Sequence, residues 1–64
     1  MEEATKLDWT IGELMVLTRR ELCDLYDAIL DILPDFEAGS VERWNALESL
    51  KNIRRVLALL RLKR

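Results

Sequence analysis

The sequence predicts an all-α fold in which a short N-terminal helix precedes an antiparallel two-helix hairpin. Thirteen of the 64 residues are Leu and only three are Gly or Pro, a balance that favours helices over a turn-rich β fold. Apolar residues recur every three or four positions along two long segments, and a short connection joins those segments. We therefore expect one small helical domain over residues 1–64.

Two capping boxes define the N-terminal part of the chain. Residues 1–9 form a polar start, and Thr10 then begins a capping box that predicts a short helix over about 11–16. Thr18 begins a second capping box and restarts the chain, although one continuous helix through Thr18 is an alternative. A helix this short is not stable alone and must be held by packing of its apolar side chains. These are Ile11, Leu14 and Leu17.

The second helix is predicted over about 19–33, because the residue before Pro34 avoids the helical region. Its apolar positions are spaced three to four apart on one face, with Cys23 and Leu30 at the margin. They are Leu22, Leu25, Tyr26, Ile29, Ile32 and Leu33. Three carboxylates, Asp24, Asp27 and Asp31, share the opposite face.

Residues 34–39 read as a connection, and Ser40 is a good N-cap for a third helix over about 41–62. Its apolar seam has heptad spacing, widened by Val56. The seam consists of Ala46, Leu50, Ile53, Leu57 and Leu60. Three residues, Trp44, Leu59 and Leu62, point away from the seam and are predicted to form a second, smaller apolar patch.

Size and apolar content predict self-association. Half of the residues are apolar, yet a domain of this size buries only about 60% of the surface that its unfolded chain exposes. With one Cys and no His, the chain has neither an internal disulfide nor the usual zinc ligand sets to stabilise it. We therefore expect a homodimer that forms a helical bundle.

Charge divides the chain into an acidic and a basic part. Residues 1–37 carry ten acidic and three basic side chains, for −7, whereas residues 38–64 carry two acidic and seven basic, for +5. The favoured interpretation is that an acidic helix packs on a basic one. A nucleic-acid or membrane-facing tail is the alternative, because the last fourteen residues contain no acid.

The residue types argue against catalysis. There is no His for general-base chemistry or to activate Cys23, which is interpreted as a structural or incidental residue beside the apolar face. Three carboxylates along one exposed helix do not make a calcium cage, and no Gly-rich phosphate loop is present. We therefore predict no catalytic residues, no cofactor and no metal. No apolar run reaches membrane-span length and the first residues do not resemble a signal peptide, which predicts a cytoplasmic protein.

The function predicted from these features is a non-enzymatic protein-interaction module, a small adaptor or regulator. The candidate interface comprises the second apolar patch and the acidic face: Trp44, Leu59, Leu62, Asp24, Asp27 and Asp31. Trp44 is the best anchor because aromatic residues dominate binding hot spots. Trp9 and Phe36 are predicted to close the two ends of the hairpin.

Two alternative functions use the charged segments. The basic C-terminal helix could bind nucleic acid through Arg54, Arg55, Arg61, Lys63 and Arg64, and a membrane surface is a weaker possibility for the same segment. The acidic half could instead imitate nucleic acid and occupy a basic protein groove. A DNA-reading helix-turn-helix at Leu17-Thr18 is disfavoured, because its recognition helix would present carboxylates to phosphates.

Overall fold

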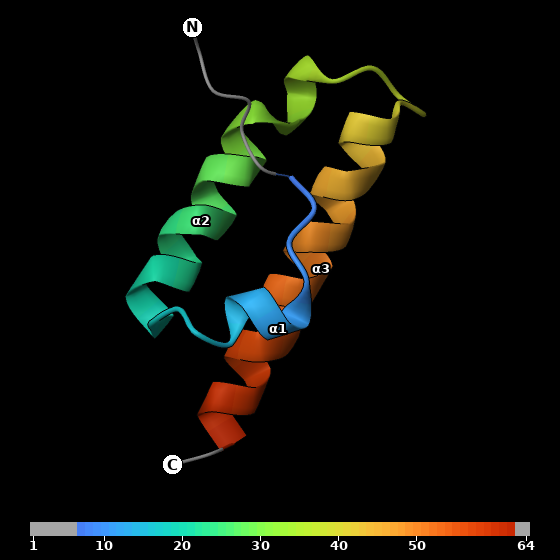
Figure 1. The fold of residues 1–64 in the computed structure, drawn as a ribbon. Helices are drawn as coiled ribbons and strands as arrows, with labels where there is room; N and C mark the ends of the chain where they lie inside the picture. The colour runs from blue at the N-terminus through green and yellow to red at the C-terminus, as the bar shows by residue number, and fades with distance from the viewer. Residues whose placement is uncertain (1–6, 63–64) are drawn as a thin grey trace, which may run out of the picture.

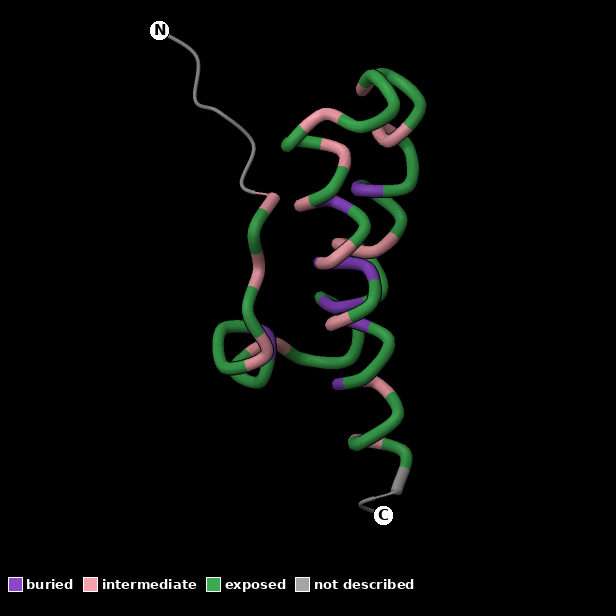
Figure 2. Tube along the Cα trace, turned by 90° about the vertical axis from the view of Figure 1, so that its right-hand side faces the viewer, coloured by how far each residue is buried: buried purple, intermediate pink, exposed green. Residues whose placement is uncertain are grey.

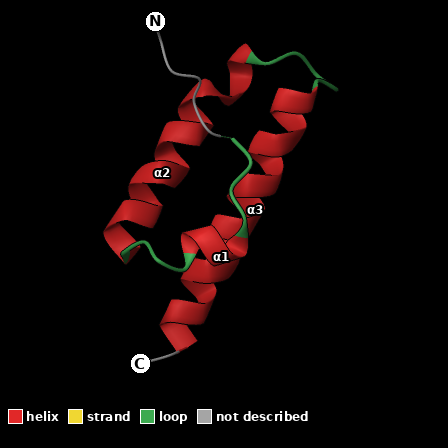
Figure 3. Ribbon diagram, in the orientation of Figure 1, coloured by secondary structure: helices red, strands yellow, loops and turns green. Residues whose placement is uncertain are grey.

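The protein folds as three helices and no strand within residues 7–62, the part of the chain that the structure, a computed structural model, describes (Figures 1 and 3). For Leu62 it describes the backbone alone. In chain order the elements are α1 (Ile11–Leu14), α2 (Arg19–Ile32), the one-turn 3₁₀ helix η1 (Leu33–Asp35) and α3 (Val41–Leu62). The predicted all-α fold, with a short helix ahead of a two-helix hairpin, is confirmed.

Helix α1 is two residues shorter than the predicted 11–16. Its capping box forms as expected: the Glu13 amide donates to Thr10 Oγ1 at 3.2 Å, and the Thr10 amide donates to Glu13 Oε1 at 2.9 Å. The helix ends early because the chain must reach the extended conformation of Thr18, φ −75° and ψ 164°, which caps α2. This break also shows that the alternative of one continuous helix is wrong.

Helix α2 ends at Ile32, one residue before the predicted limit, and continues as η1. Pro34 has no N–H to donate to a carbonyl four residues back, so the chain tightens into a 3₁₀ turn closed by the Phe36 amide on the Leu33 carbonyl at 3.1 Å. The Arg43 guanidinium then donates from Nη1 to the carbonyl oxygens of Leu33 and Phe36, each at 3.4 Å. A side chain of α3 thereby bonds to the carbonyl groups of η1 and of its C-cap residue, Phe36.

Helix α3 begins and ends where the sequence predicted. Ser40 is its N-cap, because Ser40 Oγ accepts from the Arg43 amide at 3.1 Å. The preceding turn depends on Gly39, whose φ of 83° is a left-handed conformation that side-chain-bearing residues adopt at a cost. The hairpin therefore turns through the 3₁₀ helix and a glycine rather than through an irregular connection over all of 34–39.

The core lies where α2 and α3 meet and where α1 packs on α3. The seam prediction is confirmed for the middle of α3, whereas Leu57 and Leu60 near its C-terminal end are only partly buried. The buried apolar residues are Leu14, Leu22, Ile29, Ala46, Leu50, Ile53 and Val56.

An extended segment, residues 7–10, lies along one side of α3; we call it the strap (Figures 1 and 2). Ser49, fully buried, accepts from the Trp9 amide at 2.9 Å and donates its hydroxyl to the Leu7 carbonyl. Asn52 donates from Nδ2 to the Trp9 carbonyl at 2.9 Å. Trp9 is thus held at the middle of α3, and the prediction that it closes one end of the hairpin is wrong. The rest of the polar start, residues 1–6, lies outside the described residues.

Candidate functional site

The predicted second apolar patch on α3 is not one continuous surface. Trp44 and Leu59 are exposed as predicted, at 63% and 46%. Fifteen residues separate them, however, which is about 22 Å along a helix that rises roughly 1.5 Å per residue. The side chain of Leu62 lies outside the described residues. The angular positions around the helix correctly predicted which way Trp44 and Leu59 point, but angles alone do not show how far apart two residues lie along the helix axis.

The neighbours of Trp44 are instead Val41 and Leu47, one turn to either side. Their side chains are 71% and 45% exposed, so the three form a continuous apolar row on the first two turns of α3. We call it the Trp44 row. At about 100° per residue, Trp44 lies on the opposite side of α3 from fully buried Ile53. The row therefore points away from the core, where a partner can reach it.

The acidic face of α2 is exposed as predicted at Asp24, Asp27 and Asp31. Arg20, four residues before Asp24, is exposed as well. Among the described residues, no group of three or more His, Cys, Asp or Glu side chains is arranged to hold a metal ion. What these three carboxylates provide is negative charge along the outer surface of the hairpin.

The basic residues Arg54, Arg55 and Arg61 of α3 are all exposed. Lys63 and Arg64, which were predicted to act with them, lie outside the described residues. Lys51 is exposed one turn before Arg54 and Arg55 and extends the positive surface toward the middle of the helix. No acidic residue lies between Ser49 and the end of α3, so this half of the helix carries positive charge alone.

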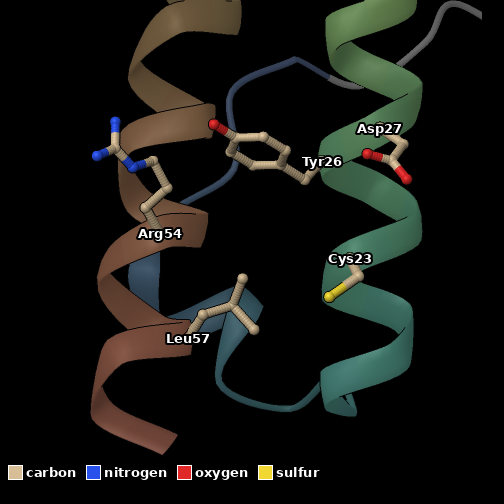
Figure 4. A pocket seen from close by; sticks show the side chains of 5 residues that line it. All are labelled: Cys23, Tyr26, Asp27, Arg54 and Leu57. Carbon is tan, nitrogen blue, oxygen red and sulfur yellow. The ribbon is translucent and has the colours of Figure 1, made fainter. Parts of the chain in front are cut away.

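A small open hollow of about 150 Å³ lies between α2 and α3. In Figure 4 the strap and α1 lie behind the two helices, so the hollow opens on the side of the hairpin that they leave uncovered. We call this the open side and the other the strap side. The residues that line the hollow are Cys23, Tyr26 and Asp27 of α2 and Arg54 and Leu57 of α3.

The lining of the hollow is apolar at its centre and charged at its two edges. Figure 4 shows the Tyr26 ring reaching from α2 toward α3, with the Cys23 sulfur also directed to the space between the helices. Asp27 points outward on the α2 edge and Arg54 points outward on the α3 edge. A surface of this kind suits a helix that carries complementary charges beside an apolar stripe.

Cys23 is exposed, which fits an incidental thiol at the margin of the apolar face and not a Cys buried in the core. Its angular position beside the apolar face is as predicted. The strap and α1 pack on the strap side, however, and leave this flank of α2 open. The hollow itself escaped sequence reasoning. One sequence feature could have indicated it. Tyr26 and Leu57 belong to the predicted apolar faces, and each lies near a charged residue, Asp27 and Arg54, of opposite sign.

Ser49 and Asn52 also escaped sequence reasoning, although they hold the strap. Ser49 follows Ala46 of the seam by three residues, so the sequence indicates that Ser49 lies on the apolar face of the helix. A polar residue at such a position is normally hydrogen-bonded, but the sequence does not say to what.

None of the three helices, over the residues described, combines the length and the apolar character needed to cross a membrane. No protein-family model matches the chain, no curated protein matches its sequence, and no solved structure matches its fold. The function is therefore argued from the surfaces of this chain.

Proposed function

We propose that this chain is a small, homodimeric, non-enzymatic interaction module that binds a protein partner. The Trp44 row carries the proposal, because it places an aromatic side chain at 63% exposure between two further exposed apolar residues. Interface hot spots are enriched in Trp, and a helix presents such anchors at spacings of three and four residues. The partner inferred from this chemistry is a protein with an apolar groove that accepts the indole.

Binding rather than catalysis also fits the residue types. The chain contains no His, and its one thiol, Cys23, therefore has no imidazole to activate it. An exposed thiol without a disulfide partner suits a reducing compartment, so we place the module in the cytoplasm.

The test is affinity capture from the source cell with the full chain as bait, in three forms. The wild type is compared with Trp44→Ala and with Leu59→Ala, which removes an exposed apolar side chain about 22 Å away on the same helix. We expect a protein that wild type and Leu59→Ala retain and Trp44→Ala loses. The purified pair should then bind roughly 30-fold more weakly when Trp44 is truncated, the effect of one hot-spot residue.

Two results would count against this proposal. One is a partner that binds Trp44→Ala as tightly as wild type. The other is the absence of any protein that distinguishes the baits. Circular dichroism of both variants controls for folding, because neither side chain belongs to the core.

Nucleic-acid binding is the second candidate, favoured by the exposure of Arg54, Arg55 and Arg61 on a half-helix without acids. It predicts binding to DNA or RNA, duplex or single-stranded. The logarithm of the binding constant should then fall linearly with the logarithm of the salt concentration. Replacing Arg54 and Arg55 by Ala should reduce the slope by about two, at roughly one per lost phosphate contact. Binding that does not respond to salt would remove this candidate.

A further inference from the structure

The open side of the hairpin has a charge arrangement that selects one partner and one geometry. Asp27 and Arg54 border the same hollow, one on each helix, and therefore lie at the same level along the hairpin (Figure 4). Between them the surface is apolar, formed by the Tyr26 ring and Leu57. Leu30, one turn after Tyr26 on α2, extends this apolar surface and is 43% exposed.

Two identical hairpins can pack open side to open side about a two-fold axis in only two ways that keep the helices aligned. If the axis runs across the helices, α2 faces the α2 of the partner and α3 faces the other α3. Asp27 then faces acidic α2 and Arg54 faces basic α3, so both contacts are repulsive.

If the axis runs along the hollow, parallel to the helices, each α2 faces the α3 of the other copy. Because Asp27 and Arg54 are at the same level, this rotation brings Asp27 of each copy opposite Arg54 of the other, twice by symmetry. Acidic α2 then packs on basic α3 across the interface, and every neighbouring pair of helices is antiparallel.

We propose that the open side is occupied by a second copy of this chain, with the two-fold axis along the hollow and two Asp27–Arg54 pairs across the interface. This inference rests on the proposed function in that it assigns the surface by which the module dimerises. Trp44 lies opposite buried Ile53 on α3 and stays accessible in such a dimer, whereas Leu47, seven residues before Arg54, is on the flank of α3 that the dimer covers. Partner capture by Trp44 and dimerisation through Asp27 and Arg54 therefore depend on different residues and can fail separately.

The test is a set of charge reversals read by the mass of the full chain in solution, by sedimentation over a range of concentrations. Asp27→Arg and Arg54→Glu should each raise the dimer dissociation constant about tenfold or more, because two exposed pairs change from attraction to repulsion. The double variant with both reversals should dimerise like wild type. An equimolar mixture of the two single variants should form a mixed dimer, since both of its pairs are complementary.

Matched controls are Asp31→Arg and Arg55→Glu. They make the same changes of charge at exposed positions on the same two helices. Asp31 is one turn after Asp27 and Arg55 is one residue after Arg54, and neither lines the hollow. We expect these to change the dissociation constant about twofold at most. Repeating the series at 0.5 M salt should shrink the differences between variants, because exposed pairs are screened.

Reactivity of the Cys23 thiol supplies a second readout in the same proteins. Cys23 lines the hollow and is exposed in the single chain, so its labelling by a thiol reagent should slow as wild type is concentrated. In Asp27→Arg, labelling should not depend on concentration over the same range. Each variant's labelling rate is compared only between concentrations of that same variant. Any direct effect of the new charge on the reactivity of Cys23 is therefore the same at every concentration.

Three outcomes would overturn the inference. A chain that remains monomeric at millimolar concentration has no second copy on its open side. A dimer that ignores both single reversals uses another surface. A dimer weakened by single reversals but not restored in the double variant or the mixture lacks the proposed pairing. A monomeric chain would also remove the homodimeric part of the proposed function, whereas none of these results bears on capture of a partner protein by Trp44, which is tested separately.

Discussion

On the strap side of the α2–α3 hairpin, a segment of the same chain covers the helices; on the open side, within residues 7–62, nothing covers them. The strap side uses neutral polar groups, with Ser49 and Asn52 bonding to the backbone of Leu7 and Trp9. The open side presents Asp27 and Arg54 at the edges of an apolar hollow.

This difference separates the residues that stabilise the monomer from those available for binding. Ser49 is fully buried and its hydrogen bonds form within the chain, so its removal affects folding. Asp27 and Arg54 are exposed, so a change there leaves the core intact and alters what can approach. Substitutions in the core, on the strap side and on the open side should therefore differ in their effects on stability and on dimerisation.

The largest loss of stability should come from the core between the two sides. Ile53→Ala, at a fully buried site, should lower the free energy of unfolding by about 2–5 kcal/mol. Leu50→Ala should fall in the same range. Leu57→Ala should cost less, because Leu57 is only partly buried and lines the hollow. Urea unfolding measures all three, and an equal loss for Leu57 and Ile53 would mean that the open side is as tightly packed as the core.

On the strap side, Ser49→Ala should destabilise the protein by about 1–3 kcal/mol, because it leaves the Trp9 amide and the Leu7 carbonyl without this partner. Asn52→Ala removes one bond at a partly exposed site and should cost about 0.5–1.5 kcal/mol. Hydrogen exchange of the Trp9 amide should accelerate in Ser49→Ala. Unchanged exchange would show that Ser49 does not hold the strap.

The two capping boxes test whether α1 is needed to keep the strap side covered. Thr18→Ala removes the cap of the 14-residue α2 and should cost about 1 kcal/mol in global stability. Thr10→Ala removes the cap of the four-residue α1. We expect it to accelerate hydrogen exchange in α1 more than in α2. Equal acceleration in both helices would show that α1 opens only with global unfolding.

The smallest effect on monomer stability should come from the open side. Leu30→Gln, at a site 43% exposed, should change the free energy of unfolding by about 0.5 kcal/mol or less in dilute protein. The same substitution should weaken dimerisation, since Leu30 extends the apolar surface beside Tyr26. Loss of more than about 1 kcal/mol in the monomer would assign Leu30 to the core instead.

Local chemistry explains why most of the fold was predictable. The capping boxes at Thr10 and Thr18, the Ser40 cap and the block at Pro34 each involve residues a few positions apart. Such signals place helix boundaries without knowledge of tertiary contacts. The errors were small at helix ends, where α1 had to stop early to reach the extended cap of α2.

The candidate site was less predictable because it depends on positions far apart in the chain. Helical periodicity correctly predicted that Trp44 and Leu59 are exposed, and the error of joining them in one patch came from neglecting the rise along the helix, about 22 Å over fifteen positions. Cys23 lies at the predicted margin of α2, and its exposure depends on which side of the hairpin the N-terminal segment covers.

The helices, their order and the middle of the buried seam follow from the sequence alone, because periodicity and capping act over three to seven residues. The sequence does not say that the strap lies against Ser49 and Asn52, which follow Leu7 and Trp9 by forty or more positions. The tertiary structure decided this, and it also decided that Asp27 and Arg54 border one hollow. The physical reason is that an amphipathic helix specifies which of its faces is buried, whereas the segment that covers each flank is chosen by competition among contacts throughout the chain.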